Sequence, residues 1–390
     1  MGRQQLPPQI KKVTVTDRRT GKPTTRYEVT ADAGINPNTG RRQQVRRRYA
    51  TEREAREALA GHQNATRTGT FVSRAPLTVE QACTHWLEGR HGIKPTTRAA
   101  YEHALQPLRT RHGDMPVQQL GKEHLDRLVN DLTAGKCPGQ RKGWTANSIN
   151  PMLNHISAVL ADLVEQGRLT RNVAAMVRRQ KRPRHQLATF TEPEVRQLLT
   201  HVERDRLGHA WHLALSGLRR GEICGLRWTD VDLAAGTLTI SHNRVSANGQ
   251  PLEYDTKTDS SARTLPLTTA LTTALQRAQH HQRQERLRLG PDYGAGAHVV
   301  CDEAGRPYHP DTISDYWRAV CKAAAVPGIR LHDARHTCGT LMHMQGQPII
   351  VIAQWLGHAD PAFTLRTYVH ANNDALRGAA AALQRVVTPS

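Results

Sequence analysis

At 390 residues the chain is too long for one ordinary hydrophobic core, so two or three domains are expected. Its 54 Lys and Arg residues against 34 Asp and Glu give a formal net charge of +20, which is typical of proteins that bind a polyanion such as nucleic acid; charge that serves only solubility is the plain alternative. The six cysteines are scattered without a Cys-x-x-Cys pair, which argues against a disulfide framework or zinc ribbon and fits a reducing cytosol.

The sequence contains no apolar run of the length needed to cross a membrane. The longest candidate, 349–353, has the size of a strand or a core segment. The first residues, Met-Gly-Arg-Gln-Gln, are not followed by a hydrophobic segment, so we expect no secretory signal. These features predict a cytoplasmic protein with no membrane partner.

Residues 1–72 form a strongly basic segment, with 15 Lys and Arg against 6 Asp and Glu. Alternation predicts short strands over 13–15, 26–30 and 41–49, and Thr51 with Glu54 forms a capping box that opens a helix to about residue 59. We interpret the segment as a small sheet with one helix, whose basic strand enters a DNA groove. A disordered basic arm is the alternative. The DNA-binding candidates here are Arg41, Arg42, Arg46, Arg47 and Arg48.

Residues 73–180 are predicted to be entirely helical. Thr78 and Gln81 make a second capping box, and further helices are expected near 96–109, 122–133, 145–166 and 172–179. Residues 181–187 then read as a basic linker stopped by a proline. Such a linker suits a crossing of DNA between two domains, although many plain surface linkers look alike. The DNA-binding candidates here are Arg178 and Arg179, at the end of the helical segment, and Lys181 and Arg182 in the linker.

Residues 188–390 are predicted to be mainly α with a small sheet. Thr191 and Glu194 cap a helix to about residue 201, and a helix over 211–216 leads into Gly217. Strands are expected over 237–240 and 252–254, on either side of the Asn248-Gly249 turn signal, and over 264–267. The remainder is expected to be helical.

Six residues of this last segment suit phosphoryl transfer without a metal or other cofactor: Arg219, Lys257, His332, Arg335, His358 and Tyr368. Transfer of a phosphodiester places negative charge on the non-bridging oxygens, which the planar fork of arginine binds well. A tyrosine hydroxyl has a pKa of about 10 and needs neighbouring cations or a base to act as a nucleophile. A lysine on a hairpin, Lys257, suits protonation of the leaving oxygen.

Each of these residues also has an ordinary interpretation. Arg219 fits a surface arginine, Lys257 a polar turn and Tyr368 a packing residue. The two histidines fit core positions or metal ligands, but the chain has no His-Glu-x-x-His motif and no Cys/His cluster at ligand spacing, so we expect no metal site. Order, spacing and basic surroundings together favour catalysis.

The string Gly-Leu-Arg-Arg-Gly-Glu at 217–222, the His332-x-x-Arg335 pair, Leu-Gly-His at 356–358 and Tyr368 closely resemble the tyrosine recombinases, in particular phage-type integrases of actinobacterial elements. The resemblance covers nearly the whole chain. It implies a basic arm-type DNA-binding domain at 1–72, a helical SAM-like core-binding domain at 73–180 and a catalytic domain at 188–390.

The resemblance also implies residue roles. Arg219 and Arg335 correspond to the two arginines of the family, Lys257 to its hairpin lysine, and His332 and His358 to its two further catalytic positions. Tyr368 corresponds to the nucleophile that forms a 3′-phosphotyrosine. Glu222 matches an acidic residue that supports the site. The implied partners are double-stranded DNA attachment sites, a homo-tetramer on DNA, a directionality factor and a host DNA-bending protein, in the nucleoid of a bacterial cell.

Three functions remain open at this point. The first is an integrase that inserts and excises a phage or mobile element. The second is a non-catalytic DNA-binding regulator on the same scaffold, which has no use for the tyrosine. The third is an enzyme of the type IB topoisomerase or telomere-resolvase kind, which shares the chemistry.

Overall fold

The computed structural model describes residues 5–16, 22–35, 42–67, 77–139, 142–182, 188–255, 262–358, 360, 362, 364 and 365. The chain divides into two compact units, Met1–Pro183 and Arg184–Ser390. This division falls inside the segment 181–187 that the sequence marks as a linker. Each unit is described below by itself.

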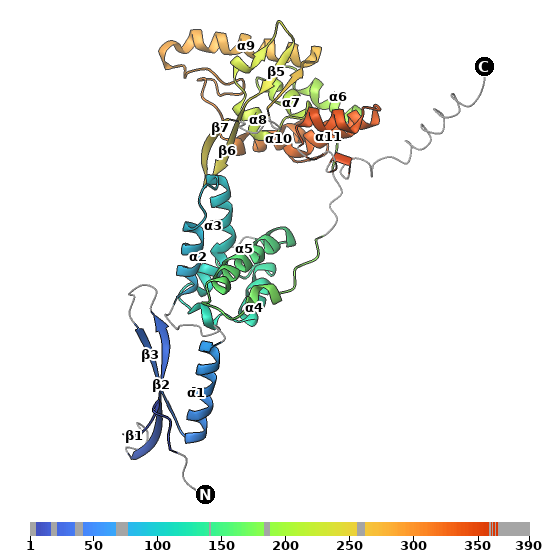
Figure 1. Cartoon of the computed structure of the whole chain (residues 1–390). Coiled ribbons are helices and arrows are strands. Elements are labelled where there is room, and N and C mark those ends of the chain that lie inside the picture. The colour runs from blue at the N-terminus through green and yellow to red at the C-terminus, as the bar shows by residue number, and fades with distance from the viewer. Residues whose placement is uncertain are drawn as a thin grey trace, which may run out of the picture. The chain divides into compact units, whose positions relative to one another are not determined.

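The N-terminal part of the first unit is a three-stranded antiparallel sheet with one helix on it (Figure 1). The elements are β1 (Ile10–Thr16), β2 (Pro23–Ile35), β3 (Arg42–Tyr49) and α1 (Glu52–Arg67). Thr51 and Glu54 form the expected capping box, but α1 runs well beyond the predicted end at 59. Ile10, Val29, Ala55 and Leu59 form a small core between sheet and helix.

The rest of the first unit is helical, as predicted. Its elements are α2 (Val79–Glu88), α3 (Pro95–His112), α4 (Lys122–Thr133) and α5 (Ala146–Glu165). The prediction of a helix over 172–179 is wrong. Only a 3₁₀ turn forms, at Val173–Met176, and the side chain of Asn172 caps it. Leu, Ile and Val side chains at helical spacing make one core that is separate from the core of the sheet.

The second unit is mainly helical with two small sheets. The helices are α6 (Glu192–His201), α7 (Gly208–Leu215), α8 (Arg220–Gly225), α9 (Thr269–Leu289), α10 (Pro310–Ala323), α11 (Leu331–Met344) and α12 (Ile349–Leu356). Residues 349–353 therefore lie in a helix, as expected for the remainder of this segment. The core contains Trp211, Trp317 and Phe190. The ring centroid of Trp317 lies 5.7 Å from that of Trp211 and 6.0 Å from that of Phe190.

The strands of this unit pair differently from the prediction. β5 (Thr237–Ile240) pairs with β4 (Val231–Asp232) and β8 (Arg263–Pro266), while β6 (His242–Ala247) and β7 (Gln250–Asp255) form a separate hairpin. The Asn248-Gly249 turn joins β6 to β7, with positive φ at both residues. β6 is not predicted from the sequence, because its polar residues do not alternate with apolar ones. No helix among the described residues is long and apolar enough to cross a membrane.

Candidate active site

The site begins where α7 ends. Ser216 ends the helix, and Gly217 takes a φ of 94°, a conformation that favours glycine. A Cβ at Gly217 would lie 2.8 Å from the side chain of Leu356 and 3.2 Å from Sγ of Cys338. The chain therefore turns at Gly217 against α11 and α12, and delivers Arg219 to the start of α8.

Arg219 lies at the N-terminus of α8, and Glu222 lies in its first turn. The Arg219 main-chain N–H donates to Oε2 of Glu222 (2.8 Å), and one terminal guanidinium nitrogen donates to Oε1 (2.7 Å). The other terminal nitrogen donates to the carbonyl of Gly357 at 2.8 Å. Glu222 is buried, whereas the Arg219 side chain keeps 36% of its surface exposed. This exposure leaves the guanidinium accessible to a ligand.

Arg335 lies on α11 and is buried, with 2% of its surface exposed. One terminal nitrogen donates to the carbonyl of Gly217 at 2.6 Å and the other donates to the carbonyl of Leu356. His332 lies one turn earlier on the same helix. The structure thus places the predicted His332 and Arg335 pair on one helix that faces the ends of α7 and α12.

The C-terminal end of α12 gathers three guanidinium groups. The carbonyls of Trp355, Leu356 and Gly357 accept hydrogen bonds from Arg263, Arg335 and Arg219, respectively. The last carbonyls of a helix have no partner within the helix and carry partial negative charge, so cations stabilise them. Gly357 ends α12 with a left-handed φ of 64°, and His358 follows it directly.

The histidines of the site are held neutral at physiological pH. Burial lowers the pKa of His358 to about 4, and the positive charges of Arg335 and Arg219 act in the same direction. Burial, then Arg335, also lowers the pKa of His332. Nδ1 of His358 lies 2.7 Å from Oγ1 of Thr364. A neutral imidazole can donate one hydrogen bond and accept another, which suits both phosphate binding and proton transfer.

Arg263 is a residue of this cluster that the sequence analysis missed. It starts β8 and its side chain is 8% exposed, with terminal nitrogens 3.2 and 3.0 Å from the two oxygens of Glu222. Burial opposes ionisation of Glu222, but hydrogen bonds from Arg263 and the charges of both arginines keep its pKa below the usual value. The available signal was a charged residue directly before the strand predicted over 264–267.

The structure brings together four of the six predicted catalytic residues: Arg219, His332, Arg335 and His358. Lys257 and Tyr368 lie outside the described residues. Among the described residues, no group of three or more His, Cys, Asp or Glu side chains is arranged to hold a metal ion. The positive charge of the site comes from arginine side chains.

The basic strand β3 divides its arginines between two faces. Arg47 pairs with Val29, which is buried under α1, so Arg47 lies on the helix-covered side. Arg46 and Arg48 are exposed on the opposite side, where Nε of Arg48 donates to Glu28 at 2.9 Å. Arg41 and the side chain of Arg42 lie outside the described residues.

The cations near the end of the first unit also differ from one another. Arg178, Lys181 and Arg182 are exposed. The guanidinium of Arg179 instead donates to four oxygens of its own unit, on Asn154, Ala174, Val177 and Leu153. These bonds occupy the fork that a DNA phosphate would need, so the prediction of DNA contact is weaker for Arg179 than for its neighbours.

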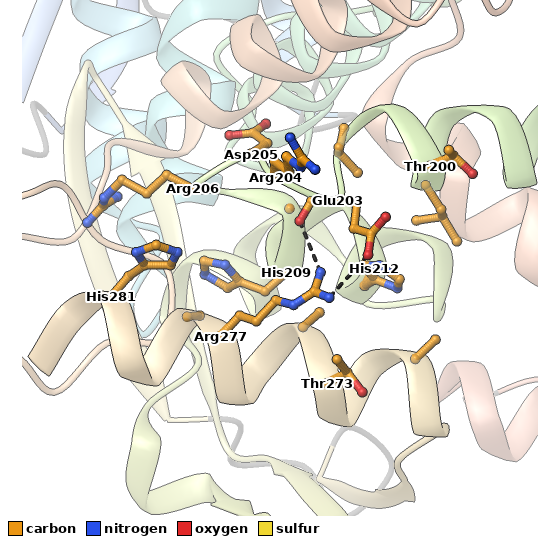
Figure 2. Close-up of a pocket in the computed structure, with 16 residues that line it drawn as sticks. Thr200, Glu203, Arg204, Asp205, Arg206, His209, His212, Thr273, Arg277 and His281 are labelled. Carbon is orange, nitrogen blue, oxygen red and sulfur yellow. Dashed lines mark hydrogen bonds and ion pairs between the residues drawn. The ribbon is translucent and has the colours of Figure 1, made fainter.

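A pocket of about 340 Å³ lies elsewhere in the second unit, between the end of α6, the start of α7 and α9 (Figure 2). Arg277 crosses it and donates to the carbonyl and to a carboxylate oxygen of Glu203, at 3.2 and 3.1 Å. His209 and His212 line it from α7. It contains none of the predicted catalytic residues, and its most central arginine is already paired.

Known proteins resemble this chain over most of its length. The profile of the phage integrase family matches residues 188–374. A XerC-like tyrosine recombinase of Caldanaerobacter subterraneus subsp. tengcongensis is 24% identical over 369 residues, which cover 88% of this chain and 92% of that one. The fold is similar to that of the Tn1549 transposon integrase bound to a circular intermediate DNA, with a TM-score of 0.64 at 18% identity over 79% of this chain and 99% of that one. It is also similar to lambda integrase in a tetramer bound to a Holliday junction, with a TM-score of 0.57 at 18% identity over 94% and 96% of the two chains.

Proposed function

We propose that the chain is a tyrosine-type site-specific recombinase of the phage integrase family, and that it integrates and excises a phage or other mobile element at DNA attachment sites. An actinobacterial element is the narrower proposal, and it rests on the resemblance of the motifs alone. The observation that supports DNA cleavage most directly is the gathering of Arg219, Arg335 and His358 at the end of α12.

In the proposed reaction Tyr368 gives its hydroxyl proton to a neutral histidine of the site, and its oxygen attacks the scissile phosphorus to form a 3′-phosphotyrosine. The bond to the 5′-oxygen breaks, and Lys257 gives that oxygen a proton. Arg219 and Arg335 bind the non-bridging oxygens, with His332 and His358 as neutral hydrogen-bonding partners. The 5′-hydroxyl of a second DNA strand then attacks the phosphotyrosine and restores a phosphodiester. The covalent link conserves the bond energy of the phosphodiester, so no ATP is required.

The proposed assembly is a tetramer on two DNA duplexes. Lambda integrase, which the chain resembles in fold, forms a tetramer on a Holliday junction. A directionality factor and a DNA-bending protein of the host complete the proposal. Residues 1–72 are proposed to bind arm sites through Arg46 and Arg48, and 73–180 to bind the core site. Arg178, Lys181 and Arg182 are proposed to contact DNA beside the linker 181–187.

The two other functions make different predictions for one experiment. A suicide DNA substrate, nicked so that the cleaved fragment diffuses away, traps a covalent 3′ complex if the chain is a recombinase. A DNA-binding regulator would bind this substrate and trap nothing. A topoisomerase-like enzyme would be trapped as well, but would relax supercoils without joining two different duplexes.

Cleavage is expected to continue in EDTA at the rate seen without it. The reason is that arginine side chains supply the positive charge that a metal ion provides in other phosphoryl-transfer sites. The measurement is single-turnover cleavage with and without chelator. A strict dependence of the cleavage step on added Mg²⁺ would contradict the proposed mechanism.

Lys257→Ala is expected to slow cleavage of a normal phosphodiester by about 100-fold, which is the usual contribution of a general acid. A substrate with sulfur in place of the 5′-oxygen should be cleaved at nearly the parental rate, because a thiolate leaves without a proton. Equal slowing on both substrates would assign the proton transfer to another residue.

Deletion of residues 1–72 is expected to remove binding to arm-type DNA and to leave cleavage of a short core duplex intact. The segment holds 9 of the 20 net positive charges and none of the catalytic candidates, so the salt dependence of total DNA binding should also fall. Gel shifts on both DNA types and one suicide substrate provide the measurement. Loss of core cleavage in a truncated chain that remains folded would refute the proposed domain division.

A further inference from the structure

Arg263 has the contacts of a residue that organises the whole site. Its Nε donates to the carbonyl of Trp355 at 2.7 Å, and its two terminal nitrogens reach the two oxygens of Glu222. A Cβ on Gly357 would lie 2.8 Å from this guanidinium, so a larger residue there would have to displace the Arg263 side chain. Arg263 therefore contacts both the carboxylate that holds Arg219 and the helix end that precedes His358.

The place of Arg263 in the chain adds a third connection. It lies six residues after Lys257 and starts β8, where it pairs across the sheet with Ile240. Arg263 thus connects β8 to the segments that carry Arg219 and His358.

The charges around Glu222 explain why this arginine matters for catalysis. One buried carboxylate lies between two arginines, of which Arg263 is nearly buried and Arg219 remains partly exposed. If Arg263 were removed, part of the negative charge of buried Glu222 would be left uncompensated, and its attraction for the guanidinium of Arg219 would increase. Without Arg263, the positive charge of Arg219 would mainly neutralise Glu222 and would be less available to a bound phosphate.

We propose that Arg263 is a positioning residue of DNA cleavage: it neutralises Glu222 and thereby leaves the positive charge of Arg219 available to the scissile phosphate. The inference rests on the proposed function. Arg263 itself is not expected to touch DNA, since all three of its guanidinium nitrogens are bonded within the protein and its side chain is far less exposed than that of Arg219.

The first test replaces Arg263 by Met, which keeps most of the length of the side chain and removes the charge. Cleavage at saturating protein is expected to fall about 100-fold, the effect of misplacing a reacting group. DNA affinity should change little, because Arg263 is buried. Arg263→Lys should recover only part of the rate, since an ammonium cannot span both Glu222 oxygens and the Trp355 carbonyl.

The second test removes Glu222 as well. In Arg263→Met with Glu222→Gln, the uncompensated carboxylate is gone, while the amide oxygen can still accept from the Arg219 main chain. This double variant is expected to cleave faster than Arg263→Met alone. A double variant as slow as the single one, or slower, would overturn the proposed charge relationship.

The third test uses DNA with a methylphosphonate at the scissile position. This group carries one negative charge fewer than a phosphodiester, so the charge of Arg219 contributes less to its cleavage. The defect of Arg263→Met should then shrink by about tenfold or more relative to normal DNA. A defect of equal size on both substrates would show that Arg263 only maintains the fold.

Arg206→Met is the matched control. Arg206 also binds a carboxylate with two nitrogens, on Glu285 at 2.6 and 2.8 Å, and a main-chain carbonyl, on Cys301 at 2.7 Å. It should lower the melting temperature like Arg263→Met but leave cleavage unchanged. Parental cleavage by Arg263→Met, or an equal cleavage defect in both variants, would overturn the inference. Failure of the parent chain to form a covalent complex would instead refute the proposed function.

Discussion

The Tyr368→Phe variant is expected to bind core-site DNA as tightly as the parent chain and to form no covalent complex with it. The substitution removes one hydroxyl and no positive charge, so phosphate binding by the arginines remains. Loss of the nucleophile should lower the rate of strand cleavage by about six orders of magnitude, the scale seen when other enzymes lose theirs. Trapping on a suicide substrate measures attachment, and a gel shift on the same DNA measures binding.

Tyr316→Phe is the control for this experiment. Tyr316 lies on α10 with 41% of its surface exposed, and nothing in the mechanism uses its hydroxyl. It should be trapped at the parental rate. A Tyr368→Phe protein that still forms the covalent complex would assign the nucleophile elsewhere, and the mechanism would then have to be rebuilt around that residue.

The sequence predicted the fold best where a local signal repeats what tertiary packing requires. The capping boxes at Thr78 and Thr191 begin α2 and α6 as expected, and α4 has the predicted bounds. The prediction failed where contacts with neighbouring residues override a local sequence pattern. Residues 172–179 have a helix-like pattern, yet only the 3₁₀ turn Val173–Met176 forms, where the side chain of Asn172 caps the turn and the backbone is extended again at Val177.

The site shows the same division between local and distant information. Spacing predicted that His332 and Arg335 share a helix, because three residues make nearly one turn. No local pattern could predict that the carbonyls of 355–357 would each accept a hydrogen bond from a different arginine. Those contacts join residues 92 and 138 positions apart for Arg263 and Arg219, and they depend on how α8, β8 and α12 pack. The motif identified Glu222, but its second partner, Arg263, can be recognised only in the folded structure.

Arg219→Ala is expected to lower the rate of single-turnover cleavage by two to three orders of magnitude, or about 3 to 4 kcal/mol of transition-state stabilisation. Arg219 is the more exposed of the two predicted catalytic arginines, so its loss should affect the reaction more than the fold. Arg219→Lys should recover little, because an ammonium lacks the planar fork that binds two phosphate oxygens. Cleavage is measured at saturating protein, so that weaker DNA binding does not enter the rate.

The adjacent Arg220 makes this prediction selective. Its guanidinium turns toward α10 and donates to Asp311 at 2.6 Å and to Ser314 at 3.1 Å, away from Glu222 and Gly357. Arg220→Ala should therefore leave cleavage close to the parental rate, although it removes the same charge from the next position in the chain. If both variants lose cleavage equally, the arginines act through the general positive field of this surface. If Arg219→Ala loses DNA affinity but keeps its rate at saturation, Arg219 positions DNA and does not stabilise the transition state.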